Sequence, residues 1–520
     1  GGKIEMNGSE LASEDEIRLE AFNSLHRVRG EEHVDKEFKF EANAENSIRL
    51  AKTKMNINRA SWYLTTGARY TPKYSVDIFG GKVDVADDVT FGVGEGTNYS
   101  SLYVIAAESL SMKNRIPEKA ITAQGNDVAF HGTVEAAGDR YSEVNIGGAT
   151  VNLDRAKFRM PRGTFSAVAI ASSADAASNS EATSTTTATA ANVLQADGMA
   201  IEGDRLATNI YAGSINLKNT TIKTAGDVEI ESYGSRAWNM RADTPTIDTL
   251  VSTTHAPTNT LTFKNTQVTG DRITMFGGKV QMKDSFAEAK SLQIAAAGTL
   301  KSMRRGYYAP AYELYPVADV DNTLYLEGTT LKSAANAMGY TGKTSLMGGR
   351  VASKDVGIQA AGLEIYAGKM ESRDGSIYLT QGTPLHLDGT KIEAPSYRSL
   401  SSAANLVKGS EVKGQDVTFV AVQSYDGGTG KATVTKDNTL SLWGSKVEAD
   451  RLSFLAGGVN AWKASEIKSQ NAMSDHAADL VHADGAAFTM QRDETSHISE
   501  AGAELGAPRV SIPAAPKEPS

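Results

Sequence analysis

The chain of 520 residues has no cysteine, few prolines and few aromatic residues. The absence of cysteine excludes a disulfide framework and a thiolate metal site. Aromatic residues make up only 7% of the chain, so we expect a thin, regularly filled core and not one large globular core. No apolar run approaches the roughly 18 residues of a transmembrane helix, so no membrane-spanning segment is expected.

Basic residues are also fewer than acidic residues. The chain carries 53 basic and 62 acidic residues, which gives a formal net charge of -9. Nucleic-acid binding requires clustered Lys and Arg that neutralise phosphates, so a nucleic-acid partner is not expected.

A short apolar pattern recurs along the chain. The segment TLTFKNTQVTG from Thr260 resembles TLYLEGTTL from Thr323, PLHLDGTKI from Pro384 and TLSLWGSKV from Thr439. A second apolar residue follows two positions after the first, and this period of two predicts a short strand with one buried face. Eight copies align, and their first apolar residues are Ile4, Val76, Val144, Ile215, Leu261, Leu324, Leu385 and Leu440.

Each aligned copy has Gly or Asn four residues after its first apolar residue, followed by a small or hydroxyl-bearing residue. These two residue types most easily adopt a positive φ at a sharp bend, so the pattern predicts a strand–turn–strand unit. The bend residues are Gly8, Gly80, Gly148, Asn219, Asn265, Gly328, Gly389 and Gly444.

A finer repeat of about 19 residues underlies the copies. Leu261 and Val280 are 19 residues apart, and so are Val351 and Met370. Short strands with tight corners at this period predict an all-β fold, a single right-handed parallel β-helix (β-solenoid) with coils of about 19 residues and inserted corner loops. An antiparallel sandwich is the alternative, but it does not require the same register in every copy.

We expect the β-helix to occupy residues 1–512, with a proline-rich tail or linker at 513–520. Within it, residues 171–192 are low in complexity and are expected to form a mobile loop. The opening GGKIEMNGS matches the middle of a repeat, so we expect the chain to be part of a longer one. Insertions are expected near 54–75, 163–200, 233–259, 303–320 and 423–437.

Catalytic signatures are missing from the sequence. It has no phosphate-binding loop, HExxH motif, calcium loop or cysteine nucleophile. Asp87 and Asp88 are adjacent, and adjacent strand residues point to opposite faces, so they are not expected to act as a pair. His476, His482 and His497 lack the regular spacing of a zinc site. We therefore expect no enzyme, cofactor or metal ion.

The segments LSLWGSKVEADRLSFLAGGV and LTFKNTQVTGDRITMFGGKV resemble the repeats of filamentous-haemagglutinin-like exoproteins, the large adhesins and contact-dependent growth-inhibition proteins of Gram-negative bacteria. The resemblance covers most of residues 1–480. It implies a secreted or surface-displayed structural and adhesive stalk that binds a glycan or protein receptor on a host or neighbouring cell. The chain has no Asn-Pro pair for the family's N-P-N secretion motif, so the secretion route, two-partner or autotransporter-like, is not carried over.

Two other functions remain open. One is a polysaccharide-active lyase or hydrolase, because such enzymes also use parallel β-helices. The other is a phage tail fibre or spike.

A basic, tyrosine-rich segment is the candidate partner-binding region. Exposed aromatic rings beside guanidinium groups suit contacts with sugars and proteins. The alternative is that the segment folds back to cover an edge or a patch of the core. Tyr325, His386 and Trp443 are expected to point outward from the strands. The candidate residues of the segment are Arg304, Arg305, Tyr307, Tyr308, Tyr312 and Tyr315.

Overall fold

The described part of the chain is built of strands joined by turns. It contains no helix, and thus no helix that could cross a membrane. The all-β prediction is confirmed. The computed structural model describes residues 2–13, 16–29, 35–57, 75–93, 99–113, 116–136, 141–177, 181–241, 248–305, 313–334, 342–370, 377–378, 384–425, 432–433, 435, 437–462, 465–475, 479–482 and 487–490.

The chain divides into two compact units. Unit 1 comprises residues 1–274 and 302–312, and unit 2 comprises residues 275–301 and 313–520. Each unit is built from coils, and each coil begins with one strand of a long parallel sheet, the first row. The chain then bends and contributes strands to a second parallel sheet before it returns to the first row.

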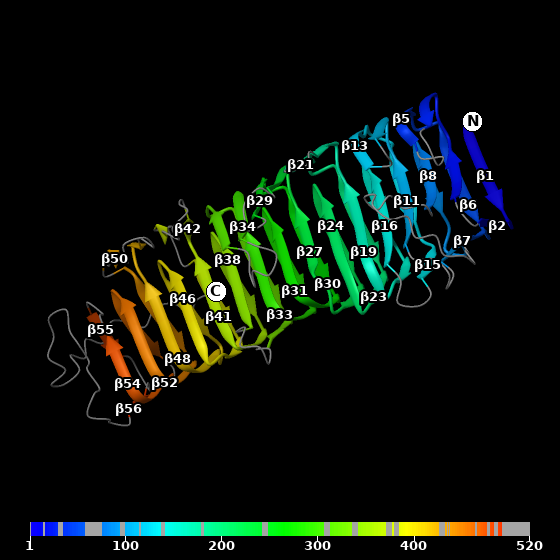
Figure 1. The fold of residues 1–520 in the computed structure, drawn as a ribbon. Helices are drawn as coiled ribbons and strands as arrows, with labels where there is room; N and C mark the ends of the chain where they lie inside the picture. The colour runs from blue at the N-terminus through cyan, green and yellow to red at the C-terminus, as the bar shows by residue number, and fades with distance from the viewer. Residues whose placement is uncertain are drawn as a thin grey trace. The chain divides into compact units, whose positions relative to one another are not determined.

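In unit 1 a coil has three strands, and the strands of successive coils pair in parallel (Figure 1). The first row is β1 (Lys3–Asn7), β6 (Ser47–Ala51), β9 (Lys82–Val85), β14 (Asp127–Phe130), β17 (Thr150–Asn152), β22 (Val193–Asp197), β25 (Ser214–Lys218) and β30 (Thr260–Lys264). The second row is β2 (Glu10–Ser13), β7 (Lys54–Ile57), β10 (Thr90–Val93), β15 (Thr133–Ala136), β18 (Lys157–Arg159), β23 (Ala200–Gly203), β26 (Thr221–Thr224) and β31 (Gln267–Gly277). The third row is β3 (Glu16–Glu20), β8 (Ser75–Gly80), β11 (Tyr99–Ala106), β16 (Tyr141–Gly148), β19 (Arg162–Ala169), β24 (Arg205–Ala212) and β27 (Val228–Ser232).

Every second coil of unit 1 also carries a β-hairpin between its third-row strand and the next first-row strand. The hairpins pair with one another in antiparallel fashion and form an outer sheet. The other coils pass from the third row to the first through a single residue, such as Gly81 or Gly213. The hairpin strands are β4 (Ser24–Arg29), β5 (Asp35–Glu41), β12 (Ser109–Lys113), β13 (Ile116–Ile121), β20 (Ser172–Ala177), β21 (Glu181–Thr187), β28 (Ser235–Arg241) and β29 (Asp248–Thr254).

The expectation of a mobile loop over 171–192 is therefore wrong. Residues 172–177 and 181–187 are β20 and β21, which pair with each other from Ser172–Thr187 to Ala177–Ala182. β21 also pairs with β28 along its whole length. The hairpin pairs through its backbone with a neighbouring strand on each side, and this pairing stabilises it although its apolar content is low. Its threonines also have a high strand propensity.

Unit 2 follows the same plan. Its first row is β32 (Lys279–Lys283), β36 (Thr323–Glu327), β39 (Arg350–Lys354), β44 (Leu385–Asp388), β47 (Ala404–Val407), β51 (Thr439–Trp443), β53 (Gly458–Trp462) and β55 (Asp479–His482). Its other parallel strands are β33 (Phe286–Ala296), β37 (Thr330–Ser333), β38 (Lys343–Gly348), β40 (Gly357–Ala360), β41 (Gly362–Ala367), β45 (Lys391–Glu393), β46 (Ser396–Ser401), β48 (Glu411–Ala421), β52 (Lys446–Ala456), β54 (Glu466–Asp475) and β56 (Ala487–Met490). Short antiparallel strands β42 (Lys369–Met370), β43 (Ile377–Tyr378), β49 (Ser424–Tyr425) and β50 (Ala432–Thr433) form a further sheet. Two further strands, β34 (Thr299–Arg305) and β35 (Glu313–Val317), are neighbours in one sheet.

The expected corners are confirmed in six of the eight aligned copies. A left-handed residue follows the first-row strand, and in five of these six copies the buried hydroxyl after it donates to a nearby carbonyl, as Thr266 does to Lys264 at 3.1 Å. The confirmed corner residues with positive φ are Gly8, Asn219, Asn265, Gly328, Gly389 and Gly444.

Two aligned copies were assigned to the wrong strand. Val76 lies in β8 and Val144 in β16, so both belong to the third row, and each pairs with Leu102 of β11. Gly80 and Gly148 accordingly have no positive φ. The error arose because third-row strands show the same alternation of apolar residues as first-row strands.

Rows of like side chains fill the coil interiors. In unit 1 the rings of Phe91, Phe130 and Phe158 stack with centroids 5.6 and 5.5 Å apart. In unit 2 Phe419 and Phe454 stack at 5.9 Å. Phe419 and Phe454 are register partners in neighbouring coils, whereas Phe130 of the first row stacks between Phe91 and Phe158 of the second row, so rings of successive coils bury their faces against one another.

Candidate functional site

The outer sheet of unit 1 lies over the third row, and two apolar clusters join the two layers. The phenylalanine cluster contains Phe38, Phe40 and Leu110 of the outer sheet, packed against Phe79 of β8. The tyrosine cluster contains Ile170, Ala188 and Tyr233, packed against Val168 and Tyr211 of the third row.

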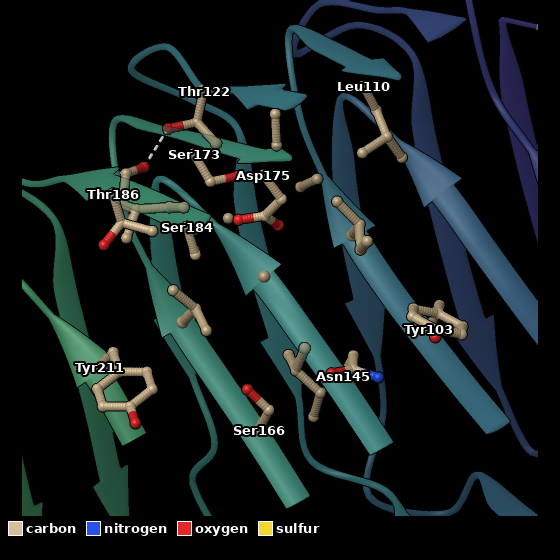
Figure 2. Close-up of a pocket in the computed structure, with 18 of the residues that line it drawn as sticks. Tyr103, Leu110, Thr122, Asn145, Ser166, Ser173, Asp175, Ser184, Thr186 and Tyr211 are labelled. Carbon is tan, nitrogen blue, oxygen red and sulfur yellow. Dashed lines mark hydrogen bonds between the residues drawn. The ribbon is translucent and has the colours of Figure 1, made fainter. Parts of the chain in front are cut away.

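Between these clusters the two layers line a cavity of about 290 Å³ that is partly open to solvent. Third-row strands β11, β16, β19 and β24 form one wall, and outer-sheet strands β12, β13, β20, β21 and β28 form the other. Figure 2 shows the two sets of side chains facing the space between the layers. The third-row wall includes Tyr103, Ile105, Asn145, Ser166, Val168 and Tyr211. The outer-sheet wall includes Leu110, Ala120, Ser173, Asp175, Ser184, Thr186 and Arg236.

The cavity exists because the hairpin β20–β21 has small side chains on its inner face. Ser173 pairs across the hairpin with Thr186, and Asp175 pairs with Ser184. In β5 the inner face is instead filled by Phe38 and Phe40, which are almost fully buried. Short side chains cannot reach the third-row strands, so the layers stay apart and the gap is lined with hydroxyl groups.

Asp175 is the ionisable side chain at the centre of this inner face (Figure 2). Ser184 donates a hydrogen bond to its carboxylate. Its Oδ1 atom is buried and has no hydrogen-bond partner among the described residues. Burial raises the pKa of Asp175, and the hydrogen bond from Ser184 opposes that rise. The carboxylate thus has unused capacity to accept hydrogen bonds or to pair with a positive charge.

At one end of the cavity Arg236 of β28 is held by acidic partners. Its Nη2 atom lies 3.0 Å from Glu229 Oε1, and its Nε atom lies 3.2 Å from Glu231 Oε2. The guanidinium also stands over the ring of Tyr211, 4.6 Å from the ring centroid. Burial raises the pKa of Tyr211 well above its ordinary value, so this phenol stays neutral.

Glu231 continues the network into the core. Its Oε1 atom is 3.0 Å from Nε2 of His255, and both side chains are almost fully buried. Burial alone would raise the pKa of Glu231. The hydrogen bond from His255 and the charges of His255 and Arg236 outweigh it, and the pKa is lowered. Nearby, Thr186 donates a 2.8 Å hydrogen bond to the hydroxyl of Tyr233.

The charges around the cavity sum to a negative value. Arg236 is the cationic residue of the lining, and two carboxylates, Glu229 and Glu231, already bind it. Asp175 adds a third carboxylate. The arrangement can therefore accept hydrogen bonds and a positive charge, with apolar walls on either side.

Within the described ranges, no group of three or more His, Cys, Asp or Glu residues could hold a metal ion. Asp87 and Asp88 stand at a corner. Asp88 accepts a 2.7 Å hydrogen bond from the backbone of Lys52, and Asp87 lies 3.8 Å from the guanidinium of Arg155. His482 lies in β55, whereas His476 and His497 fall outside the described residues.

The predicted partner-binding segment lies mostly beyond what the structure describes. Arg304 and Arg305 end β34, and Tyr315 lies in β35. Tyr307, Tyr308 and Tyr312 fall outside the described residues. The segment stays a prediction.

The three expected outward positions differ from one another. Tyr325 is half-buried, and its hydroxyl donates to Glu327 at 3.2 Å. His386 is also half-buried, and burial lowers its pKa. Trp443 alternates with the buried Leu442 as an outward position does, but it is only 7% exposed, so it offers little surface to a partner. It packs against Val407 of the preceding coil, and two large apolar side chains in register cover each other.

Comparison with known proteins adds no assignment. No protein-family model matches the chain, and neither the curated proteins nor the solved structures gave a match.

Sequence reasoning missed the cavity and the residues around it. Asp175, Ser184 and Thr186 lie in the low-complexity segment that was set aside as a loop. One signal was available: in SSADAA the polar residues Ser173 and Asp175 alternate with alanines, which is the period of a strand with two distinct faces.

Proposed function

We propose that the chain is a single right-handed parallel β-helix that serves as a structural and adhesive stalk of a secreted or surface-displayed bacterial exoprotein. The observation that supports it most directly is the constant register of the parallel rows. In unit 1, Leu194 pairs with Ile215, and Ile215 pairs with Leu261, so the same apolar position recurs from coil to coil. Outward positions are free of this constraint, and a repeat scaffold can vary them without losing its fold.

A buried asparagine ties consecutive coils together in this scaffold. Asn126 stands immediately before β14, and its Nδ2 donates to the carbonyl of Gly81 in the preceding coil at 2.8 Å. Its Oδ1 accepts from the backbone of Ala123 at 2.7 Å. The same two bonds recur at Asn192, Asn259, Asn322 and Asn438. A chain built to carry load or to hold ligands at a distance benefits from such coil-to-coil bonds.

The proposed partner is a glycan or protein receptor on a host or neighbouring cell. The test is attachment of fluorescent beads coated with the chain to epithelial cells and to Gram-negative bacteria, with beads carrying the heat-denatured chain as the control. Equal attachment of both bead types contradicts the adhesive function. A variant lacking residues 304–316 examines the tyrosine-rich segment. Loss of attachment with unchanged melting supports a binding role, and loss of stability with unchanged attachment supports a covering role.

The two other functions predict different results. A polysaccharide-active enzyme releases new reducing ends or unsaturated products from a panel of acidic polysaccharides. A phage fibre or spike forms a stable trimer, which light scattering detects. Either result would replace the adhesive stalk.

A further inference from the structure

We propose that the cavity under the outer sheet of unit 1 binds a small organic cation, with its ammonium group at Asp175 and a compact apolar body between the layers. This inference goes beyond the adhesive function and does not depend on it. It rests on the position of Asp175, on the charges around it and on the walls of the cavity.

The first argument is the unsatisfied carboxylate. Oδ1 of Asp175 is buried without a hydrogen-bond partner in the described part of the chain, and a buried polar atom without a partner is costly. An ammonium group supplies both a positive charge and several donors. Ser173, Ser184 and Thr186 place hydroxyl oxygens along the same wall, where they can accept its remaining hydrogen bonds (Figure 2).

The second argument concerns the sign of the ligand's charge. Arg236 is the only cation that lines the cavity among the described residues, and Glu229 and Glu231 already bind it at 3.0 and 3.2 Å. An anionic ligand would have to compete with these two carboxylates and would also face Asp175. A cation meets the opposite situation, because Asp175 has no cationic partner in the lining and its Oδ1 atom accepts no hydrogen bond from the described residues.

The third argument is size and polarity. About 290 Å³ corresponds to roughly ten water molecules at about 30 Å³ each, which is room for one ring-sized molecule. Ile105 and Val168 of the third row and Leu110 of the outer sheet provide apolar contacts for such a ring. Apolar walls with a few converging polar groups are the usual composition of a small-molecule site.

The experiment compares three probes that share one ring and differ in charge: benzylamine, benzyl alcohol and benzoate. Binding to the complete chain is measured by ligand-observed saturation-transfer NMR with titration. We expect benzylamine to bind about tenfold more tightly than benzyl alcohol because its ammonium group makes a charge-assisted hydrogen bond to Asp175; a tenfold ratio corresponds to about 1.4 kcal/mol. We expect benzoate not to bind. Equal affinities, preference for benzoate, or no benzylamine binding at millimolar concentration overturns the proposal.

Three variants locate the site. Asp175→Asn keeps the shape and removes the charge, so benzylamine should fall to the affinity of benzyl alcohol. Glu202→Gln removes an exposed carboxylate of β23 outside the cavity and should leave the tenfold preference intact. Val168→Phe fills the cavity and should abolish binding of both probes. Melting curves confirm that each variant is folded, and a preference that survives in Asp175→Asn refutes the assignment.

Discussion

Replacement of Asn126 by alanine tests how the coils of unit 1 are joined. Asn126 is only 1% exposed, and its side chain bonds the N–H of Ala123 at 2.7 Å and the carbonyl of Gly81 at 2.8 Å. Asn126→Ala removes both bonds and leaves the carbonyl of buried Gly81 without this partner, whereas Ala123 is exposed and its N–H can bond to water. An unsatisfied buried group costs about 1–3 kcal/mol, so the local loss of stability should be about 1–3 kcal/mol.

The isosteric change Asn126→Asp keeps the volume of the side chain and alters only its hydrogen bonding, so it separates the two contributions to stability. The new carboxyl can still accept from Ala123, but near neutral pH its second oxygen faces the carbonyl of Gly81. Burial and this repulsion raise its pKa in the folded state above the unfolded value of about 3.9. The protonated carboxyl can donate to Gly81, so Asn126→Asp should approach wild-type stability below the unfolded pKa. That stability is lost as the pH rises through the folded pKa.

The assay is amide hydrogen exchange followed by mass spectrometry, because a repeat scaffold does not unfold as one two-state unit. Peptides covering residues 123–152 should lose protection in Asn126→Ala, while peptides from coils further away should lose less. Asn216→Asp, on the exposed face of β25, is the matched control and should change little. Wild-type protection in Asn126→Ala would refute the view that these side chains join the coils.

Three further predictions concern unit 1. Lys52 has φ 49° and an exposed side chain, so Lys52→Gly should stabilise by up to about 1 kcal/mol, whereas Lys54→Gly in the neighbouring strand should destabilise by about as much. Urea melts in which Lys52→Gly destabilises the chain as much as Lys54→Gly does contradict this. Phe158→Ala empties a fully buried ring site and should cost about 3–5 kcal/mol, with exposed Tyr141→Ala as the control, and equal melting temperatures contradict it. Glu231 has a lowered folded pKa, so its stabilisation is complete above its ordinary pKa of 4.5 and is lost as the pH falls through the folded value. Glu231→Gln should therefore flatten the acid limb of stability measured by far-UV circular dichroism, and an unchanged acid limb contradicts the assignment.

The regular part of the fold could be predicted from the sequence because it depends on local chemistry. Asn219 and Asn265 were identified as corner residues because asparagine accepts a left-handed backbone, and both have φ close to 48°. Other coils use the same conformation with residue types that were not sought as corners. Lys52, Arg155 and Lys408 carry no local signal for it, whereas Asp284 and Asp355 belong to a type that tolerates a left-handed backbone.

The outer sheet and its cavity could not be predicted because they depend on pairs that are distant in sequence. Leu110 pairs with Phe40, and Thr186 pairs with Arg236. No local pattern in a low-complexity hairpin states which strands will lie beside it. The space next to Asp175 depends on the side chains of five outer-sheet strands and four third-row strands, and it becomes visible only when these are assembled.

The alternation of plain and hairpin-bearing coils follows from strand spacing. Neighbouring strands lie about 4.8 Å apart in parallel and antiparallel sheets alike, so two coils advance by about 9.6 Å, and a two-stranded hairpin occupies the same distance. One hairpin for every two coils therefore gives a continuous outer sheet, whereas one for every coil would crowd it. The plain coil must pass under the returning hairpin, and Gly81 meets this need: a Cβ atom there would lie 1.6 Å from the carbonyl oxygen of Asn43. Asn46 returns the chain from the hairpin and accepts the backbone N–H of Gly81 at 2.7 Å, so glycine and asparagine together set the two-coil period.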